Sequence, residues 1–537
     1  MRGADLLAQT LAAAGVTRVF SLSGNQIMPV YDAFLDVNIE IVHSRHEAAC
    51  VFMADAWAQL TGSIGVCLVT AAPGATNALG PLYTARQSES PVLFLTGDSP
   101  LAQDGRGAFQ ELDQVAMTAP VTKLSLRAKD PGTLGQDAAE AVRVALSDRP
   151  GPVHMALPVD VLDAHVTDAA APANDASRAQ AHGPDPDEVQ FLGKALAAAS
   201  QPLLVCGPAM SPTRYGTRLS ALADAADAPV VAMESPRGLK DPALGDFAKA
   251  MAKADLVVSF GKRVDFALGF GSADVCLPTC RWIVIDAEAG ECDRARLNLA
   301  DRLDLAIPAD PTAVADLLIR ERPGNAGRSA WRSEVASYIG ARSYSESDVR
   351  SAAGIHPAAL CAAVQRQVDA AAESVVISDG GEFGQWSQAV TSATHRLING
   401  PGGAIGGGLC YGIAAKLAKP GAVVFALMGD GTVGFHLAEF ETAVREDTPF
   451  VVVVGNDGCW NAEHLIQMRD YGPERLIGCT LSNARYDQAV RALGGHGEYV
   501  TDLADLDDAL ARAVRSGKVA CVNVVIEGVP APAGAAH

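Results

Sequence analysis

Two apolar runs in the last third of the sequence, 423–427 and 450–454, each end in a turn that combines glycine with an oxygen-bearing side chain. The turns read Gly429-Asp430-Gly431-Thr432 and Gly455-Asn456-Asp457-Gly458. In a parallel sheet the carboxyl ends of such strands meet at one edge, which is where the ligands of open α/β sheets bind. The Asp430 carboxylate, the Asn456 amide and a backbone carbonyl at Gly458 are hard oxygen donors, the kind that Mg²⁺ prefers. The spacing therefore predicts a cation site at this edge.

The segment between the two runs is predicted to be a helix, because Phe435, Phe440 and Val444 are spaced to form one apolar face. Backbone amides of Gly431 and Thr432, at the N-terminus of that helix, would bind a phosphate group. A bound Mg²⁺ usually completes its coordination with phosphate and water. This stretch alone thus predicts a site for Mg²⁺ and a diphosphate, which many nucleotide enzymes could share.

With these two turns the sequence resembles the thiamine diphosphate (ThDP) enzymes, whose signature is GDG, a helix, a strand and then Asn-Asn. Gly455 stands at the first Asn, and Asn456 stands at the second, which is the metal ligand of the family. The resemblance implies cofactor contacts from both turns, at Gly429, Asp430, Gly431, Thr432 and Asn456. It also implies that Mg²⁺ is held by Asp430, Asn456 and the backbone of Gly458.

A second string, at 45–77, carries Glu47. Taken alone, Glu47 is an acidic residue at a helix N-terminus, where the helix dipole favours it. The whole string RHEAACVFMADAWAQLTGSIGVCLVTAAPGATN resembles the pyrimidine-domain signature of acetolactate synthase-like ThDP enzymes, in which this Glu hydrogen-bonds N1′ of the aminopyrimidine. A carboxyl group in an apolar pocket has a raised pKa and can protonate N1′, which makes the 4′-nitrogen a base beside the reacting carbon. The resemblance also places Asn77 on the pyrimidine side, as a contact or structural residue.

Two further strings match the same family. Phe109 and Gln110 stand where acetolactate synthase-like proteins have residues facing the reacting end of the cofactor, although a core ring and a turn amide are equally good interpretations. The glycine run 402–408 could be a flexible loop, but glycines also let the backbone approach a cofactor closely. The resemblance gives Gly403 a backbone carbonyl that accepts from N4′, and gives Ile405 the role of propping ThDP in a V shape.

Other positions are less informative. Glu382 and Phe383 replace a Gln-His pair that touches the diphosphate in the family, so no diphosphate contact is predicted there. Histidines are the usual proton shuttles, and the sequence does not select among its candidates. These candidates are His43, His46, His436 and His464.

The elements that must position these residues alternate between strand and helix over three ranges, 1–165, 187–320 and 356–537. This alternation predicts an α/β protein of three doubly wound parallel-sheet domains. The resemblance identifies them as the pyrimidine-binding, middle and diphosphate-binding domains. Polar stretches at 166–186 and 321–355 are predicted to be connectors.

Composition and charge narrow the range of possible binding partners. The chain has 537 residues and a formal charge of −20, which argues against nucleic acid and against anionic membrane surfaces. No apolar run is long enough to span a membrane. The eleven cysteines lack paired CxxC spacing and are interpreted as reduced thiols rather than as a disulfide frame or a zinc site. We therefore expect a cytoplasmic protein with a small-molecule substrate.

The resemblance leaves the substrate open. An acetolactate synthase-like C–C lyase or carboligase would decarboxylate a 2-oxo acid and transfer or release the aldehyde unit, but the Arg that grips a second 2-oxo acid in that family aligns with Ala267. The string GKRVDFALGFG at 261–271 instead looks like 2-hydroxyacyl-CoA lyases and oxalyl-CoA decarboxylase, which implies an acyl-CoA substrate and an adenine nucleotide such as ADP or CoA in the middle domain. A third hypothesis is a non-catalytic ThDP-binding assembly protein.

The same resemblance also bears on FAD binding and on the oligomeric state. The middle domain is short where flavin-bearing relatives bind FAD, so FAD and a flavin-dependent oxidase are weak interpretations. Glu47 and Asp430 lie in different domains, and in this family ThDP bridges the first domain of one subunit and the third of another. The resemblance therefore implies a homodimer or a dimer of dimers, with active sites between subunits.

Overall fold

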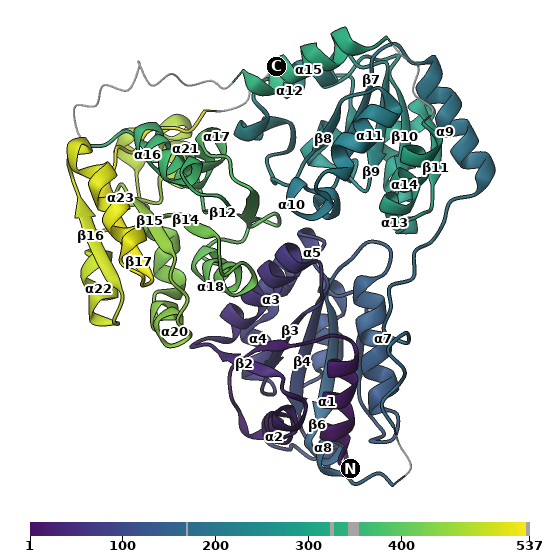
Figure 1. Ribbon diagram of the computed structural model, residues 1–537, viewed down its shortest axis with the longest axis vertical. Helices are drawn as coiled ribbons and strands as arrows, with labels where there is room; N and C mark the ends of the chain where they lie inside the picture. The colour runs from purple at the N-terminus through teal and green to yellow at the C-terminus, as the bar shows by residue number, and fades with distance from the viewer. Residues whose placement is uncertain (168–169, 323–326, 342–353, 533–537) are drawn as a thin grey trace.

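The computed structural model describes residues 1–167, 170–322, 327–341 and 354–532. Three parallel sheets, each flanked by helices, form three units that follow one another along the chain (Figure 1). The predicted α/β class with three doubly wound parallel sheets is confirmed. Each sheet lies inside one of the three predicted domain ranges, whose boundaries stay predictions.

The first and third sheets have the same strand order, which is 2-1-3-4-6-5 when each sheet is numbered from its own first strand. The first sheet contains β1 (Arg18–Ser21), β2 (Glu40–His43), β3 (Gly65–Val69), β4 (Val92–Asp98), β5 (Ser125–Arg127) and β6 (Val153–Pro158). The third contains β12 (Ser374–Asp379), β13 (His395–Asn399), β14 (Val423–Gly429), β15 (Val451–Asn456), β16 (His496–Val500) and β17 (Ala520–Val525).

The second sheet is smaller and has the order β11-β10-β9-β7-β8. Its strands are β7 (Pro202–Cys206), β8 (Val230–Ala232), β9 (Leu256–Phe260), β10 (Arg281–Ile285) and β11 (Leu303–Ile307). Helices α9 (Pro186–Ala198), α10 (Pro212–Tyr215), α11 (Arg218–Ala226), α12 (Phe247–Met251), α13 (Ala289–Leu299), α14 (Pro311–Glu321) and α15 (Ser329–Gly340) accompany this sheet.

The helices of the outer units lie on both faces of their sheets. In the first unit they are α1 (Gly3–Ala13), α2 (Met28–Val37), α3 (Glu47–Thr61), α4 (Pro73–Asn77), α5 (Leu79–Gln87), α6 (Gln114–Thr118), α7 (Leu134–Leu146) and α8 (Val159–Asp163). In the third they are α16 (Pro357–Asp369), α17 (Glu382–Val390), α18 (Gly408–Ala418), α19 (Asp430–Val433), α20 (Glu439–Arg445), α21 (Asn461–Asp470), α22 (Tyr486–Ala492) and α23 (Leu506–Arg515).

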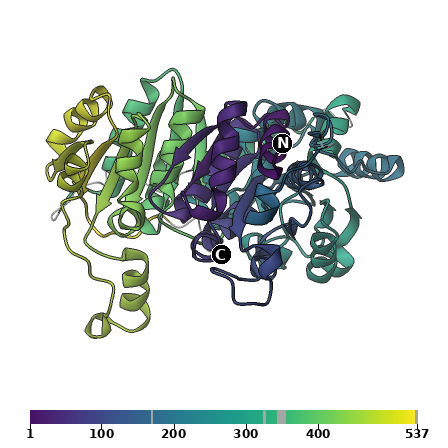
Figure 2. The ribbon, with the colours of Figure 1, turned by 90° about the horizontal axis from the view of Figure 1, so that it is seen from below.

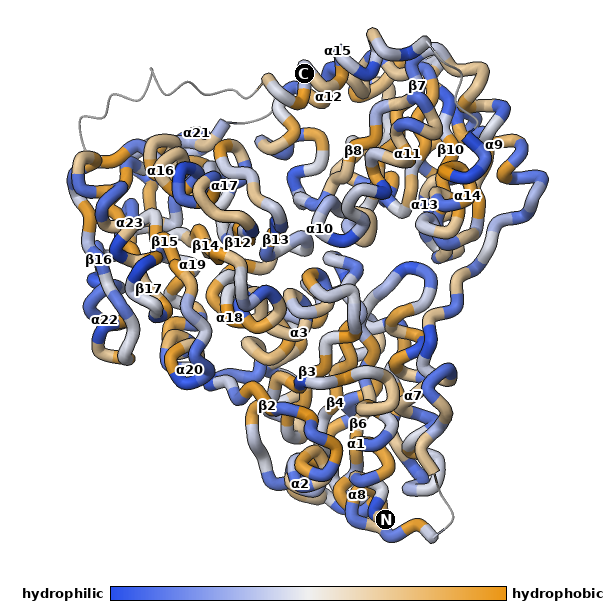
Figure 3. The backbone as a smooth tube through the Cα atoms, in the orientation of Figure 1, coloured by the Kyte–Doolittle hydropathy of each residue, from blue (hydrophilic) through white to orange (hydrophobic). Residues whose placement is uncertain are grey.

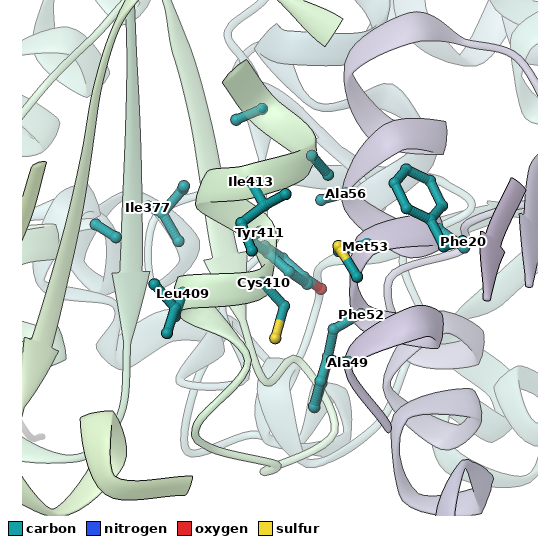
Figure 4. Packing of buried hydrophobic residues seen from close by; sticks show 14 of the residues in the cluster. Phe20, Ala49, Phe52, Met53, Ala56, Ile377, Leu409, Cys410, Tyr411 and Ile413 are labelled. Atoms are coloured by element: carbon teal, nitrogen blue, oxygen red, sulfur yellow. The ribbon is translucent and has the colours of Figure 1, made fainter. Parts of the chain in front are cut away.

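A single apolar core joins the first and third units. Hydrophobic residues gather on the central strands and on α3 and α18 (Figure 3). Figure 4 shows these two helices packed together, with Phe52 and Met53 on α3 facing Cys410 and Tyr411 on α18. The Tyr411 hydroxyl donates to the fully buried Asp55 carboxylate across this contact. Because α3 and α18 each follow the second strand of their sheet, the contact pairs equivalent elements of the two units.

The prediction of a single helix after Asp430 was wrong. The segment is divided into α19, a 3₁₀ turn at Gly434–His436 and α20. The turn changes the helical phase, so Phe440 is buried while Phe435 and Val444 are 55% and 38% exposed.

The predicted connector at 321–355 also differs from the structure where it is described. Helix α15 lies within it and buries Trp331 and Val335 in the core of the second unit. The Trp331 indole N–H donates to the Pro202 carbonyl at 2.8 Å, so this helix is part of that unit. No helix in the described ranges is long and apolar enough to cross a membrane.

Candidate active site

A cavity lies at the carboxyl edge of the third sheet, where β14 and β15 end side by side. The register pairs Gly429 with Gly455, so the turns that follow the two strands start level with each other. The cavity is lined by both turns and by Ile405, Phe383, Trp460 and Glu463. The predicted cofactor residues Gly429, Asp430, Gly431, Thr432 and Ile405 all lie on its wall.

Asp430 is the buried acid of this cavity. It is 2% exposed, and its Oδ2 atom has no hydrogen-bond partner in the structure. Burial, and next the charge of Asp457, raise the pKa of Asp430 to about 7, although backbone N–H groups oppose the shift. A buried carboxylate oxygen without a donor, beside a second acid, fits a hard divalent cation.

Asn456, the predicted metal ligand, ends β15 and is hydrogen-bonded within the protein. Its side chain is fully buried, and the amide nitrogen donates to the Ala484 carbonyl at 3.2 Å and to Asn523 Oδ1 at 3.1 Å. Its Oδ1 accepts from the Gly458 N–H at 3.2 Å. Both ends of the amide are therefore used within the protein, and Asn456 is absent from the residues that line the cavity.

Asp457 follows Asn456 in the same turn. It lines the cavity, its Oδ1 accepts from the Cys459 N–H at 3.1 Å, and burial raises its pKa to about 6. The Gly458 carbonyl accepts from the Leu481 N–H at 2.7 Å, whereas Cys459 lies on the cavity wall. Asp457 and Cys459 are therefore further candidate oxygen donors of this turn, beside the predicted Asn456 and Gly458.

The turn after β14 is packed tightly. A Cβ atom on Gly431 would come within 2.4 Å of the Trp460 ring, so glycine is required for this approach. The Thr432 hydroxyl donates to the Gly429 carbonyl at 2.9 Å and therefore stabilises the turn itself. Helix α19 has only four residues, so the predicted anion-binding N-terminus belongs to a short helix.

The glycine run is held by Asp379, whose role the sequence did not reveal. This residue ends β12, and its carboxylate accepts from the Gly406 N–H at 3.1 Å and from the Gly408 N–H at 2.7 Å. Burial raises the pKa of Asp379 to about 6. Gly403 has a φ of +89°, the left-handed region that glycine favours. The run is therefore a constrained loop that carries Ile405 to the cavity.

Glu382 and Phe383 occupy the start of α17. A Cβ atom on Gly455 would come within 2.6 Å of the Phe383 ring, so the ring closes one side of the cavity. The Glu382 carboxylate accepts from the Ala531 N–H and from Gln385 Nε2, the latter at 3.2 Å. Burial raises its pKa. Its charge is thus tied to the last described residues and to α17.

The residues predicted in the first unit form a separate group. Glu47 begins α3, and its Oε2 accepts from Asn77 Nδ2 at 3.0 Å. The Gln26 side chain donates to Gln110 Oε1 at 2.5 Å, and Phe109 is 72% exposed. None of these residues lines the cavity of the third unit in the same chain. The structure brings each half of the predicted site together but leaves the halves apart.

The four histidines considered as proton shuttles lie in different environments. His436 is buried, its Nδ1 lies 2.8 Å from the Gly406 carbonyl, and its ring packs edge-on against His46 at 5.9 Å. His46 caps α3, with its Nδ1 accepting from the Ala48 N–H. Burial lowers the pKa of His43. His464 lies on α21, close in sequence to Trp460 and Glu463 of the cavity wall.

Two of these residues could have been found earlier. Asp457 stands beside Asn456, and an acid at that position was a visible alternative donor. Asp379 ends an apolar strand in the string Asp379-Gly380-Gly381, which repeats the pattern of Gly429-Asp430-Gly431. The signal in both cases is an acid at the end of a buried parallel strand.

The fold and the cavity define a class of α/β enzymes that bind a charged cofactor at the carboxyl edge of a parallel sheet. Comparison with known families narrows this class. Residues 1–117 match the N-terminal TPP binding domain of thiamine pyrophosphate enzymes, and residues 343–524 match the C-terminal TPP binding domain. The chain belongs to this family of ThDP-dependent enzymes.

The similarity to individual relatives extends over nearly the whole chain. A probable acetolactate synthase of Mycobacterium bovis is 31% identical, over 98% of this chain and 96% of the relative. The 2-hydroxyacyl-CoA lyase 2 of Danio rerio is 28% identical over 98% and 91%, and that of Bos taurus is 28% identical over 98% and 90%. The chain is thus similar both to a probable acetolactate synthase and to 2-hydroxyacyl-CoA lyases.

Proposed function

We propose that this ThDP enzyme is a Mg²⁺-dependent C–C lyase or carboligase that decarboxylates a 2-oxo acid, as an acetolactate synthase-like enzyme would. The observation that carries the proposal is the Asp430 carboxylate, whose buried Oδ2 has no hydrogen-bond partner among the described residues and which lies within the field of a second acid, Asp457. The M. bovis relative supports the choice of reaction.

The cavity residues have distinct roles in this proposal. Asp430, Asp457 and the Cys459 carbonyl would hold Mg²⁺, and the amides around Gly431 would hold the diphosphate. Ile405 would support the bend between the two rings of ThDP, with the Gly403 carbonyl accepting from the 4′-nitrogen. When bound, ThDP supplies a carbon nucleophile and an acceptor for the electron pair that decarboxylation leaves behind.

Glu47 would act on the other end of the cofactor. Asn77 donates to Glu47 Oε2, which leaves Oε1 to hydrogen-bond the pyrimidine nitrogen N1′ and to hold a proton there. Phe109 and Gln110 would face the substrate, with Gln26 holding the Gln110 amide in place.

The separation of the two halves supports a site made by two copies of the chain. The third unit also offers apolar surface for such contact, since Ile466, Tyr471 and Ile477 are 45%, 65% and 80% exposed. Figure 2 shows α21 and the chain after it extending away from the third sheet. We expect at least a homodimer, in which Glu47 of one copy serves the Asp430 cavity of another.

The test is a substrate panel with ThDP and Mg²⁺, read by mass spectrometry and by CO₂ release. Release of CO₂ from pyruvate or another 2-oxo acid, abolished by EDTA, is the expected result. Purified protein that binds ThDP but converts none of the 2-oxo acids would overturn the proposed reaction.

A second candidate is a 2-hydroxyacyl-CoA lyase or an acyl-CoA decarboxylase. Ala267, rather than a cation, stands in the segment after β9, and the D. rerio relative supports this alternative. The second sheet could carry the adenine nucleotide. Formyl-CoA formed from a 2-hydroxyacyl-CoA would favour this candidate over the first.

We do not expect FAD at the edge of the second sheet. The buried Arg149 pairs there with Asp286, which directly follows β10, and with Glu89 of the first unit. Arg149 also donates to the Gly261 carbonyl at 2.9 Å, after β9. This network holds charged side chains at the ends of the two strands, and we expect colourless purified protein.

A further inference from the structure

A large recess lies between the second and third units, beside the candidate active site. Its volume is about 550 Å³. One wall is apolar and contains Leu239 and Phe266, and the ring of Phe266 is 63% exposed. Gln385 of α17 closes the side toward the third unit. An exposed aromatic ring in a recess of this size marks a ligand surface better than a packing defect.

Two cations border this recess. Arg237 directly precedes the short 3₁₀ helix Gly238–Lys240 and Lys240 ends it, and both line the recess together with one acid, Asp274. In the described residues neither side chain has a hydrogen bond or an ion pair. This is unusual in a chain of net charge −20, where most arginines have an acidic partner. Cations left without a carboxylate fit an anionic ligand.

The backbone fixes where Arg237 lies. Gly238 has a φ of +56°, and a Cβ atom there would come within 2.5 Å of the Ala267 Cα atom. The backbones of these two residues therefore touch, and Arg237 is carried to the segment that follows β9. That segment has Ala267 and no cation of its own between Phe266 and Gly271, so the positive charge comes from the neighbouring turn.

The recess and the catalytic cavity are lined by neighbouring residues of α17. Gln385 lines the recess and donates to Glu382 Oε2 at 3.2 Å, while Glu382 lines the cavity. The charge of Arg237 also acts on Glu382, where it lowers the carboxyl pKa against the larger, raising effect of burial. A molecule in the recess could therefore extend toward the reacting centre.

We propose that Arg237 binds an anionic group of the substrate while Phe266 and Leu239 contact its apolar chain. The substrate class is then an acid or acyl compound that has an apolar chain of several carbons together with a carboxylate or phosphate. This inference rests on the proposed function, because it assigns a specificity subsite to the same active site. Arg237 is a binding residue here and takes no part in bond breaking.

The test compares straight-chain 2-oxo acids of three to eight carbons with the same chains ending in a second carboxylate, because the carboxylate beside the oxo group is lost as CO₂. With the ThDP- and Mg²⁺-loaded wild type, kcat/KM should rise about fourfold for each methylene that the recess buries. For the acids with a second carboxylate, Arg237→Gln should raise KM about tenfold or more with kcat nearly unchanged, and Arg237→Lys should recover part of the loss. Phe266→Ala should flatten the dependence on chain length.

Arg320→Gln is the matched control, since it removes the same charge from α14, a helix that does not line the recess. It should leave KM within about twofold of the wild type. Equal KM values in Arg237→Gln and Arg320→Gln would overturn the inference while leaving the proposed function intact.

A second measurement distinguishes failure of the proposed subsite from failure of the proposed function. Binding of octanoate and of octyl phosphate is followed by calorimetry in the wild type and in Arg237→Gln, without turnover. Weaker binding of either anion to Arg237→Gln supports the subsite even if no 2-oxo acid is converted. The stronger ligand of the two identifies the anionic group, and equal binding of both anions by both proteins contradicts the inference.

Discussion

The first and third sheets have the same strand order, but the acidic side chains at their carboxyl edges have different partners. At the end of the fourth strand the first unit has Asp98, which is 1% exposed and pairs with Arg127 at 2.5 Å. At nearly the same place the third unit has Asp457, which has no ion pair in the described residues. Burial raises the pKa of both carboxyls, but in Asp98 the arginine opposes the shift. Asp98 thus has a protein cation as its partner, whereas Asp457, which we propose as a metal ligand, has none among the described residues.

The helices after the second strand differ in a similar way. In the first unit α3 begins directly with Glu47, so an acid stands at the edge of the sheet. In the third unit the glycine run precedes α18 and is held by Asp379, so the backbone lines the edge. One edge offers a proton-holding side chain, and the other offers space and backbone groups. The two edges therefore supply complementary halves of a cofactor site.

The sharpest test of this comparison is to remove one buried acid from each edge. Asp430→Ala should lower activity about 1000-fold or more, because it removes a charged ligand of the proposed Mg²⁺. The metal-free variant should unfold at the same temperature as the wild type or higher, since a buried, unpaired charge is lost. Rates with Mg²⁺ titration and thermal unfolding measure both effects.

Asp98→Ala is the control in the other unit. It should cost about 1–3 kcal/mol of unfolding free energy while leaving the Mg²⁺ requirement unchanged. An Mg²⁺ effect in Asp98→Ala comparable to that in Asp430→Ala would contradict the assignment of different uses to the two edges.

Complementation tests whether the halves come from different copies. Glu47→Gln should lower activity about 100- to 1000-fold, because it removes the proton-holding group at N1′. Co-expressed Glu47→Gln and Asp430→Ala chains should recover about a quarter of wild-type activity, since half of randomly formed dimers are mixed and each mixed dimer has one intact site. Differently tagged chains allow the mixed dimer to be isolated and assayed. No recovery in that dimer would argue for sites within one chain.

The turn after β15 allows a comparison of two neighbouring residues. Asp457→Ala should weaken Mg²⁺ binding about 10- to 100-fold without changing metal-free stability. Asn456→Ala should destabilise the metal-free protein by about 1–3 kcal/mol, because Ala484 and Asn523 lose their buried partner. Mg²⁺ titrations by calorimetry and urea unfolding distinguish these outcomes, and the reverse pattern would restore Asn456 as the ligand.

The sequence predicted the parallel sheets because their strands are continuous apolar runs such as 423–427 and 450–454, which only burial on both faces explains. It predicted Asp430 from an oxygen donor at the end of a buried strand, and the family resemblance added Ile405. It predicted Asn456 rather than Asp457 at the second turn, whereas Asp457 is the one that lines the cavity. That choice depends on the direction of a single turn and on hydrogen bonds to residues far along the chain, such as Asn523.

The recess beside Arg237 shows the same limit of sequence reasoning. Arg237 and Ala267 are distant in sequence, and only the contact between Gly238 and Ala267 brings the arginine to the segment after β9. The residue types in the sequence and their spacing do not predict such a contact. Only the structure reveals it.

The smallest predicted effect concerns acid stability, where the two sheets again differ at equivalent strands. His154 on β6 is fully buried, and burial lowers its pKa to about 3. Its ring nitrogens lie 2.9 Å from the hydroxyls of Thr96, Thr118 and Ser125. The equivalent residue of β17, by register with β15, is Cys521, a buried thiol that stays neutral through acid pH.

Since the folded state holds His154 neutral while the unfolded chain protonates it near pH 6.5, its contribution to stability is complete above pH 6.5 and is lost as the pH falls below it. Between pH 6.5 and pH 5 this linkage should cost ~2 kcal/mol of unfolding free energy. His154→Gln should be less stable at neutral pH but should lose less stability on acidification, and urea unfolding at both pH values measures the difference. Hydrogen exchange should locate the acid-induced opening in the first sheet; an opening that starts at the third sheet, or an unchanged pH slope in His154→Gln, would show that another group controls acid stability.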